Sequence, residues 1–182
     1  MSRVLSALFA SALAVGVWAQ APMQQPKMTV DQKFLMGAAS GGMFEVTISQ
    51  MAMERSQDED VKKIAKKMID DHGKANQELM KIAQTKNIML PQQMDPVHMA
   101  IVTKLGGEQG EDFDECFLAT QVLAHEEALM CFRKESRMGQ DAELKKFAEK
   151  SLPTLREHAR MVRRAFRHAD DGDARESAKP ER

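Results

Sequence analysis

Four ionisable side chains interrupt the apolar stripes of four predicted helices: Glu45, His72, His125 and His158. Each stands where a spacing of three or four residues would otherwise place an apolar side chain against a core. A carboxylate or an imidazole is costly to bury unless it is hydrogen-bonded or holds a metal ion. Three imidazoles and one carboxylate suit a divalent transition ion such as Zn, Fe, Mn or Cu. These four residues are therefore candidate metal ligands, with Asp71 as a further ligand or an outer contact to one.

Two other interpretations of the same residues stay open. The four groups could form a structural Glu–His hydrogen-bond cluster without a metal, or the helices could be out of register. Met68 and Met161, each within one turn of a candidate histidine, offer thioether ligands for Cu(I). Methionine at helical spacing is, however, usually core filler. His98 and His168 fall outside the pattern and are expected in solvent.

Apolar periodicity predicts the helices that must position these side chains. The expected helices cover residues 30–55, 57–87, 111–138 and 142–169, and a short extra helix covers about 96–105. Very short links join the first helix to the second and the third to the fourth, which forces antiparallel neighbours. The sequence thus predicts an all-α protein, an up-and-down four-helix bundle with a short extra helix in the second connection.

Boundary residues support this division of the chain. Residues 29–32 and 56–59 each read as a capping box that opens a helix. Gly139 is a natural C-terminal cap, and Asp141 can cap the helix that follows. Pro153 lies inside the last helix and predicts a kink there.

Counted from the short turns, the four candidate ligands lie at similar heights in the bundle. Within each hairpin the two members differ by about four residues, which is ~6 Å at the rise of an α-helix. Glutamate and histidine side chains can close most of that gap across a core. The four residues therefore lie at similar heights along the bundle and also face its core.

The N-terminus indicates export. A positive Arg3 precedes a charge-free apolar stretch and a small-residue exit, so residues 1–19 are predicted to be a signal peptide. An uncleaved anchor is the alternative. Residues 20–29 should form a flexible mature N-terminus, residues 30–168 the helical domain, and residues 169–182 a disordered polar tail. No later segment is apolar enough to cross a bilayer, and the periplasm or cell envelope is the expected location.

Composition narrows the partners. The net charge is −1, with 26 basic and 27 acidic residues, which argues against nucleic acid as a partner. Methionine is abundant at 15 residues, and no tyrosine is present, which favours helix over strand. Cys116 and Cys131 fall on one predicted helix about 22 Å apart, too far for a disulfide between them. An envelope protein is a candidate partner, and no feature indicates the oligomeric state.

Several ordered segments resemble a known family. They are Phe34-Leu35, Ala38, Gly42, Glu45-Val46, residues 68–72 (MIDDH), Phe113-Asp114, His125, Leu152-Pro153 and His158. Over residues 30–168 the chain is similar to the secreted bacterial family catalogued as domain of unknown function 4142, often labelled "predicted outer membrane protein". The resemblance implies a ferritin-like four-helix bundle and no established activity.

One departure from ferritin chemistry limits the function. Di-iron ferritins use Glu-x-x-His on two helices, whereas the residues three before the candidate histidines are Ile69, Val122 and Leu155. An enzyme is therefore less expected than a binding protein. The sequence favours an exported bundle that binds one divalent transition metal through its Glu/His cluster. The alternative is a non-enzymatic envelope interaction or stress-related protein in which the cluster is structural.

Overall fold

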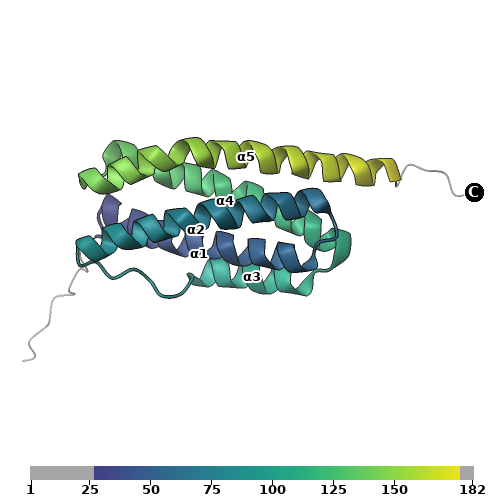
Figure 1. Ribbon diagram of the computed structural model, residues 1–182, viewed down its shortest axis with the longest axis horizontal. Helices are drawn as coiled ribbons and strands as arrows, with labels where there is room; N and C mark the ends of the chain where they lie inside the picture. The colour runs from purple at the N-terminus through teal and green to yellow at the C-terminus, as the bar shows by residue number, and fades with distance from the viewer. Residues whose placement is uncertain (1–26, 177–182) are drawn as a thin grey trace, which may run out of the picture.

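The structure, a computed structural model, describes residues 27–176, with side chains described as far as Ala169, and this part of the chain contains five helices and no strand. The helices are α1 (Val30–Arg55), α2 (Glu59–Thr85), α3 (Pro96–Gly107), α4 (Gly110–Met138) and α5 (Ala142–Glu176). Four are long and pack as a bundle, with the short α3 alongside (Figure 1). The predicted all-α class and the bundle-like packing are confirmed.

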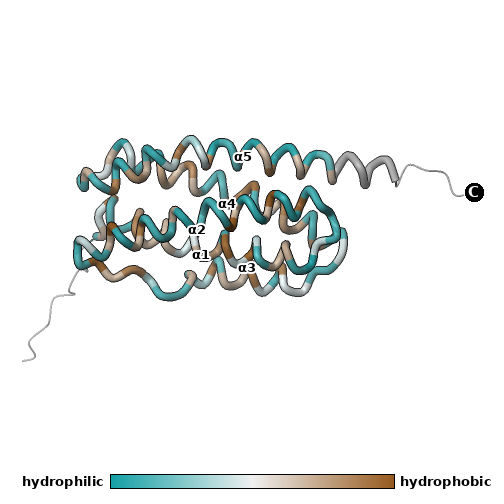
Figure 2. The backbone as a smooth tube through the Cα atoms, in the orientation of Figure 1, coloured by the Kyte–Doolittle hydropathy of each residue, from teal (hydrophilic) through white to brown (hydrophobic). Residues whose placement is uncertain are grey.

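Helix pairing follows from the short links. α1 packs along α2, and α4 packs along α5, so each short turn joins two neighbouring helices. α1 also contacts α4, α2 contacts α5, and α3 lies mainly against α1. Hydrophobic and hydrophilic residues alternate along the long helices, as amphipathic helices around a shared core require (Figure 2).

Most of the capping residues predicted from the sequence are found at the helix ends. Thr29 accepts from the backbone of Gln32, whose side chain accepts from the Thr29 N–H, a complete capping box. Gly139 caps the end of α4, and the Asp141 carboxylate accepts from the first turn of α5. The second expected box is wrong, because Asp58 rather than Ser56 caps α2. The aspartate lies next to the exposed amides, whereas the serine is buried in the turn.

The end of α5, its internal proline and the N-terminal segment were also predicted from the sequence. α5 continues to Glu176, so the tail prediction is wrong for residues 170–176; an established helix can extend through polar residues because propagation is easier than nucleation. Pro153 lies inside α5, as expected. The predicted signal peptide lies outside the described residues. Within the described residues, no helix combines the length and apolarity needed to cross a membrane.

The core consists of two main clusters at opposite ends of the bundle. One joins the C-terminal half of α1 and the N-terminal half of α2 to α4 and α5, and includes Ile48, Met68, Phe113, Phe117 and Val162. The other gathers residues from the opposite helix ends. Its buried members are Phe34, Leu35, Ala39, Leu79, Ile82, Leu144, Phe147 and Ala148. The buried histidines occupy the level between these two clusters.

Candidate metal centre

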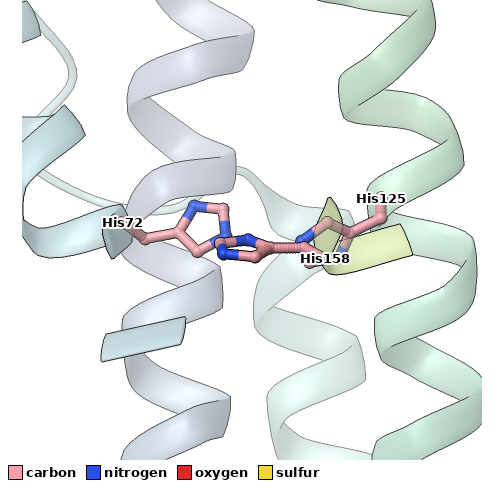
Figure 3. A group of neighbouring side chains, drawn as sticks. All are labelled: His72, His125 and His158. Carbon is pink, nitrogen blue, oxygen red and sulfur yellow. The ribbon is translucent and has the colours of Figure 1, made fainter. Parts of the chain in front are cut away.

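Three imidazoles meet in the bundle core. His72 comes from α2, His125 from α4 and His158 from α5, and their ring centroids are 5.3 to 5.4 Å apart. One nitrogen of each ring lies within 4.8 Å of the nitrogens offered by the other two. Figure 3 shows the three rings directed toward one another from separate helices. The sequence-based expectation that these residues share a level is met for the histidines.

Hydrogen bonds hold two of the rings by the nitrogen that faces away from the cluster. His125 Nδ1 lies 2.9 Å from the backbone carbonyl oxygen of Gln121, and His158 Nε2 lies 3.0 Å from Asp71 Oδ2. Both partners only accept, so these two nitrogens carry the hydrogens and donate them. In a neutral ring the other nitrogen then holds a lone pair.

One nitrogen of each ring is buried and has no hydrogen-bond partner among the described residues. These atoms are His72 Nε2, His125 Nε2 and His158 Nδ1. A buried polar atom without a partner usually costs about 1–3 kcal/mol. The hydrogen bonds described above leave a lone pair on His125 Nε2 and His158 Nδ1, and His72 Nε2 carries one as well when the proton of that ring is on Nδ1. This arrangement suits a positive ion better than it suits a hydrogen-bond network.

Glu45 lies beside the cluster and not within it. Its Oε1 is 3.5 Å from His125 Nδ1, the nitrogen that already faces the Gln121 carbonyl. Its Oε2 is buried and has no hydrogen-bond partner among the described residues. The structure thus brings together three of the four residues singled out as ligands, with the carboxyl group on the outer side of one of them.

Burial controls the charge state of the site. It raises the pKa of Glu45 to about 8, against a smaller lowering effect of the Gln121 side chain. Burial also lowers the pKa of His72 well below its ordinary value and that of His125 to about 4. The pKa of His158 falls for the same reason, although its hydrogen bond to Asp71 opposes the change. At neutral pH the rings are therefore uncharged, the form in which imidazole binds metals.

Asp71 links the cluster to the bundle surface. Its Oδ2 accepts from His158 Nε2 at 3.0 Å and from Lys67 Nζ at 3.1 Å. Burial raises the pKa of this carboxyl, but the hydrogen bonds from His158 and Lys67 outweigh it and lower the pKa overall. Asp71 therefore stays ionised and fixes the orientation of the His158 ring. The hydrogen bond places Asp71 behind His158, and its expected role as an outer contact to a metal ligand stays a prediction.

Other residues were placed differently from expectation or were not anticipated. His98 is not in solvent: it stacks on Phe44 at 4.5 Å between ring centroids, and its Nδ1 lies 2.7 Å from Asp95. Ser40 bonds the same carboxylate and fastens α3 to α1. Gln121, whose carbonyl oxygen accepts from His125, was not predicted. Its position four residues before a histidine of the apolar stripe indicated that it faces the core.

The two methionines of the copper hypothesis belong to the apolar core. Met68 is fully buried in the cluster around Phe113 and Phe117, and Met161 packs against that cluster. Both sulfur side chains have an apolar packing role there. His168 is exposed, as expected.

The chain belongs to the family described as a domain of unknown function, DUF4142, whose profile matches residues 18–165. Among curated proteins, none matches the sequence significantly. The resemblance to this family drawn from the sequence is therefore confirmed.

Solved structures share the fold at low sequence identity. A DUF305 protein from Streptomyces coelicolor aligns with a TM-score of 0.66 at 15% identity, covering 78% of this chain and 92% of that one. A DUF305 fragment from Deinococcus radiodurans gives 0.69 at 15%, covering 79% and 99%. CopM in its Cu(II)-bound form gives 0.65 at 15%, again covering 79% and 99%. At this identity the likeness establishes the fold alone.

Proposed function

We propose that this DUF4142 protein binds one divalent transition metal ion between His72, His125 and His158. The observation that carries the proposal is the set of three buried, partner-free ring nitrogens on three converging helices. Two of the rings are held from behind by an acceptor, which is how metal-binding histidines are usually oriented. Glu45 stands close enough to His125 to join the ion as a fourth ligand after a side-chain rotation, or to support that ring.

The ligand set favours zinc or copper among the candidate ions. Imidazole nitrogen suits Zn, Cu, Fe and Ni, whereas Mn prefers oxygen ligands. Affinity for a nitrogen site generally rises toward Cu(II). The copper-bound form of the similarly folded CopM is a further reason to include copper in any titration. Three protein ligands leave an ion room for another group, as in sites that exchange ligands.

The remaining parts of the functional proposal concern context. We place the protein in the exported fraction, in the periplasm or cell envelope, on the basis of the predicted signal at residues 1–19. Its four long helices support a ferritin-like relationship without the Glu-x-x-His pairs of di-iron enzymes. A binding role is accordingly favoured over catalysis.

A structural role for the cluster is the second candidate. The Asp71–His158 hydrogen bond and the approach of Glu45 to His125 would both exist in a purely structural polar core. In that case the protein would act as an envelope interaction or stress-related protein without a metal. The rings do not hydrogen-bond one another, however, which weakens the polar core as an explanation of why three histidines converge.

Metal analysis of the untagged full chain tests the proposal. We expect one ion per chain after incubation with Zn or Cu and dialysis, measured by elemental analysis, and a raised melting temperature. His125→Ala should weaken binding at least 100-fold, because it removes a ligand and opens the core. His168→Ala is the matched control, since His168 is exposed, and should change nothing. Absence of stoichiometric metal with all four candidate ions would refute the proposal and favour the structural role.

A further inference from the structure

A cavity of about 340 Å³ adjoins the histidine cluster on the side of the Phe34–Phe147 core. Residues of all four long helices line it, including Glu45, His72 and His158. Lys74 and Lys150 are exposed where α2 and α5 border the cavity, and Gly37 and Glu127 are exposed on α1 and α4. The cavity therefore connects the buried imidazoles with the surface.

On α1 the cavity is bordered mainly by residues with a small side chain or none. Gly37, Ala38, Gly41 and Gly42 line it on consecutive turns of that helix. A Cβ atom added at Gly41 would meet nothing within 4 Å, which marks open space. A Cβ at Gly42 would instead collide with the Asn76 side chain. Glycine costs helix stability of roughly 0.5–1 kcal/mol per residue relative to alanine, so this hollow comes at the expense of the helix.

The opposite walls are apolar. Phe132 and Phe147, whose centroids are 5.9 Å apart, line the cavity together with Leu79, Ala128 and Leu155. Asn76, Ser151 and Thr154 add polar groups to this lining. Two aromatic rings, tilted by 44° to each other, and several aliphatic side chains make this part of the lining hydrophobic. Such a lining favours an apolar body in preference to a chain of water molecules.

Buried polar atoms without a hydrogen-bond partner border the cavity where it meets the histidine cluster. His72 Nε2, His158 Nδ1 and Glu45 Oε2 are partner-free, and each belongs to a residue at least nine-tenths buried. Among the charged groups nearer the surface, Lys150 bonds Glu78 at 2.7 Å and Asp71 bonds Lys67. Lys74 and Glu127 also border the cavity, and their charged side chains are exposed to solvent at its opening. An occupant thus meets unsatisfied polar atoms at its inner end, whereas the charges that border the cavity are either paired or exposed to solvent at its opening.

We propose that this cavity binds a small neutral molecule with one or two aromatic rings, whose single hydroxyl or azole head is directed at Glu45 and the histidines. An apolar cavity of about 150 Å³ accommodates benzene, so a cavity of 340 Å³ has room for two rings. Glu45 Oε2 and the free ring nitrogens supply the hydrogen-bond partners that such a head needs. The inference stands on the cavity and does not depend on the proposed metal.

The probe is 4-phenylphenol, titrated calorimetrically into the full chain after metal removal with EDTA. We expect saturable one-to-one binding with a Kd on the order of 100 μM, which is ordinary for about 13 non-hydrogen atoms. Gly41→Leu fills the open space and should weaken binding at least tenfold. Gly107→Leu is the matched control, because its added side chain also meets nothing but lies on α3 outside the cavity.

Two further measurements keep the inference falsifiable. In the unsubstituted chain, nuclear Overhauser contacts from the probe should reach the methyl groups of Ala38 and Ala128, even if Gly41→Leu fails to fold. The charged analogue 4-phenylbenzoate should bind at least tenfold more weakly. Absence of saturable binding, equal binding by Gly41→Leu, contacts confined to surface residues, or tighter binding of the benzoate would each overturn it. Because no metal is present, these results are independent of the proposed metal site.

Discussion

Replacing Glu45 with glutamine should change how the stability of the metal-free protein depends on pH. The carboxyl is buried beside His125, and burial raises its pKa from 4.5 to about 8. The folded state therefore favours the protonated acid. This contribution to stability is complete below pH 4.5 and is lost progressively as the pH rises toward 8. Glutamine has nearly the same shape and cannot ionise, so Glu45→Gln should not show this loss.

The magnitude follows from the size of the shift. One pKa unit corresponds to ~1.4 kcal/mol between protonation states, so the full shift to about 8 would amount to nearly 5 kcal/mol as an upper bound. Water entering the adjacent cavity will solvate part of the ionised carboxylate and reduce this. We expect the wild type to lose about 2–3 kcal/mol of unfolding free energy relative to Glu45→Gln between pH 5 and pH 8.5.

Urea denaturation with EDTA present, at pH 5, 7 and 8.5, measures the effect. The difference in slope is the readout, because the amide also changes local hydrogen bonding by a pH-independent amount. Glu127→Gln serves as the control, since Glu127 lies exposed on α4 at the rim of the same cavity. Parallel pH profiles for the wild type and Glu45→Gln would show that the carboxyl is hydrated and ionised at neutral pH, and would refute the reasoning.

Three other predictions concern the same chain. Asp71→Asn should weaken zinc or copper binding 10- to 100-fold, measured by calorimetry, because it loosens the His158 ring that Asp71 orients. The control Asp70→Asn, at the adjacent exposed position, should change the affinity by less than twofold. Equal losses of affinity in the two variants would contradict this. Burial lowers the pKa of all three imidazoles, that of His125 to about 4, so the zinc affinity of Glu45→Gln, which has no carboxyl to titrate at residue 45, should be flat from pH 8 to 6 and fall below about pH 5; a midpoint near 6.5 would disagree. Burial and the nearby Asp31 raise the pKa of Glu135 to about 7, so Glu135→Gln should gain on the order of 1–2 kcal/mol over the wild type above pH 7 and nothing at pH 4, measured by urea denaturation; an equal gain at both pH values would count against it.

The helices and the phase of the histidines could be predicted because both depend on local periodicity. A polar residue that replaces one step of an apolar stripe must face the core if the helix does. His72, His125 and His158 met this condition and are buried together. The lengths of the short turns fixed their relative heights. Neither inference needed information about how the helices are rotated against one another.

The position of the Glu45 carboxyl could not be predicted, because it does depend on how the helices are rotated against one another. Its place in the stripe established that it faces the core, and it is 5% exposed. Whether its carboxyl meets the cluster-facing or the outer nitrogen of His125 depends on a small rotation of α1 against α4. Sequence periodicity does not resolve such a rotation. The sequence also did not decide which residue caps α2, because Ser56 and Asp58 are both competent caps two residues apart.

His98 and the cavity were missed because both depend on contacts between elements distant in sequence. His98 stacks on Phe44 and its Nδ1 lies 2.9 Å from Ser40 Oγ, and these contacts exist only after α3 folds back onto α1. The cavity requires that the side chains of α2, α4 and α5 leave unfilled the space beside the small residues of α1. The glycines at 37, 41 and 42 were visible in the sequence, but small residues also permit close helix packing. Only the neighbouring side chains decide between a close contact and a cavity.

The two sides of the histidine layer differ, and this difference bears on how the imidazoles could be reached. On one side Ile48, Met68, Phe113 and Phe117 are fully buried and pack into a continuous core. On the other side the glycines of α1 leave the cavity that connects to the surface. An ion or small molecule would therefore approach the free ring nitrogens through the cavity. Gly41→Leu should slow metal uptake more than it weakens metal affinity, because it narrows the approach and leaves the three rings in place.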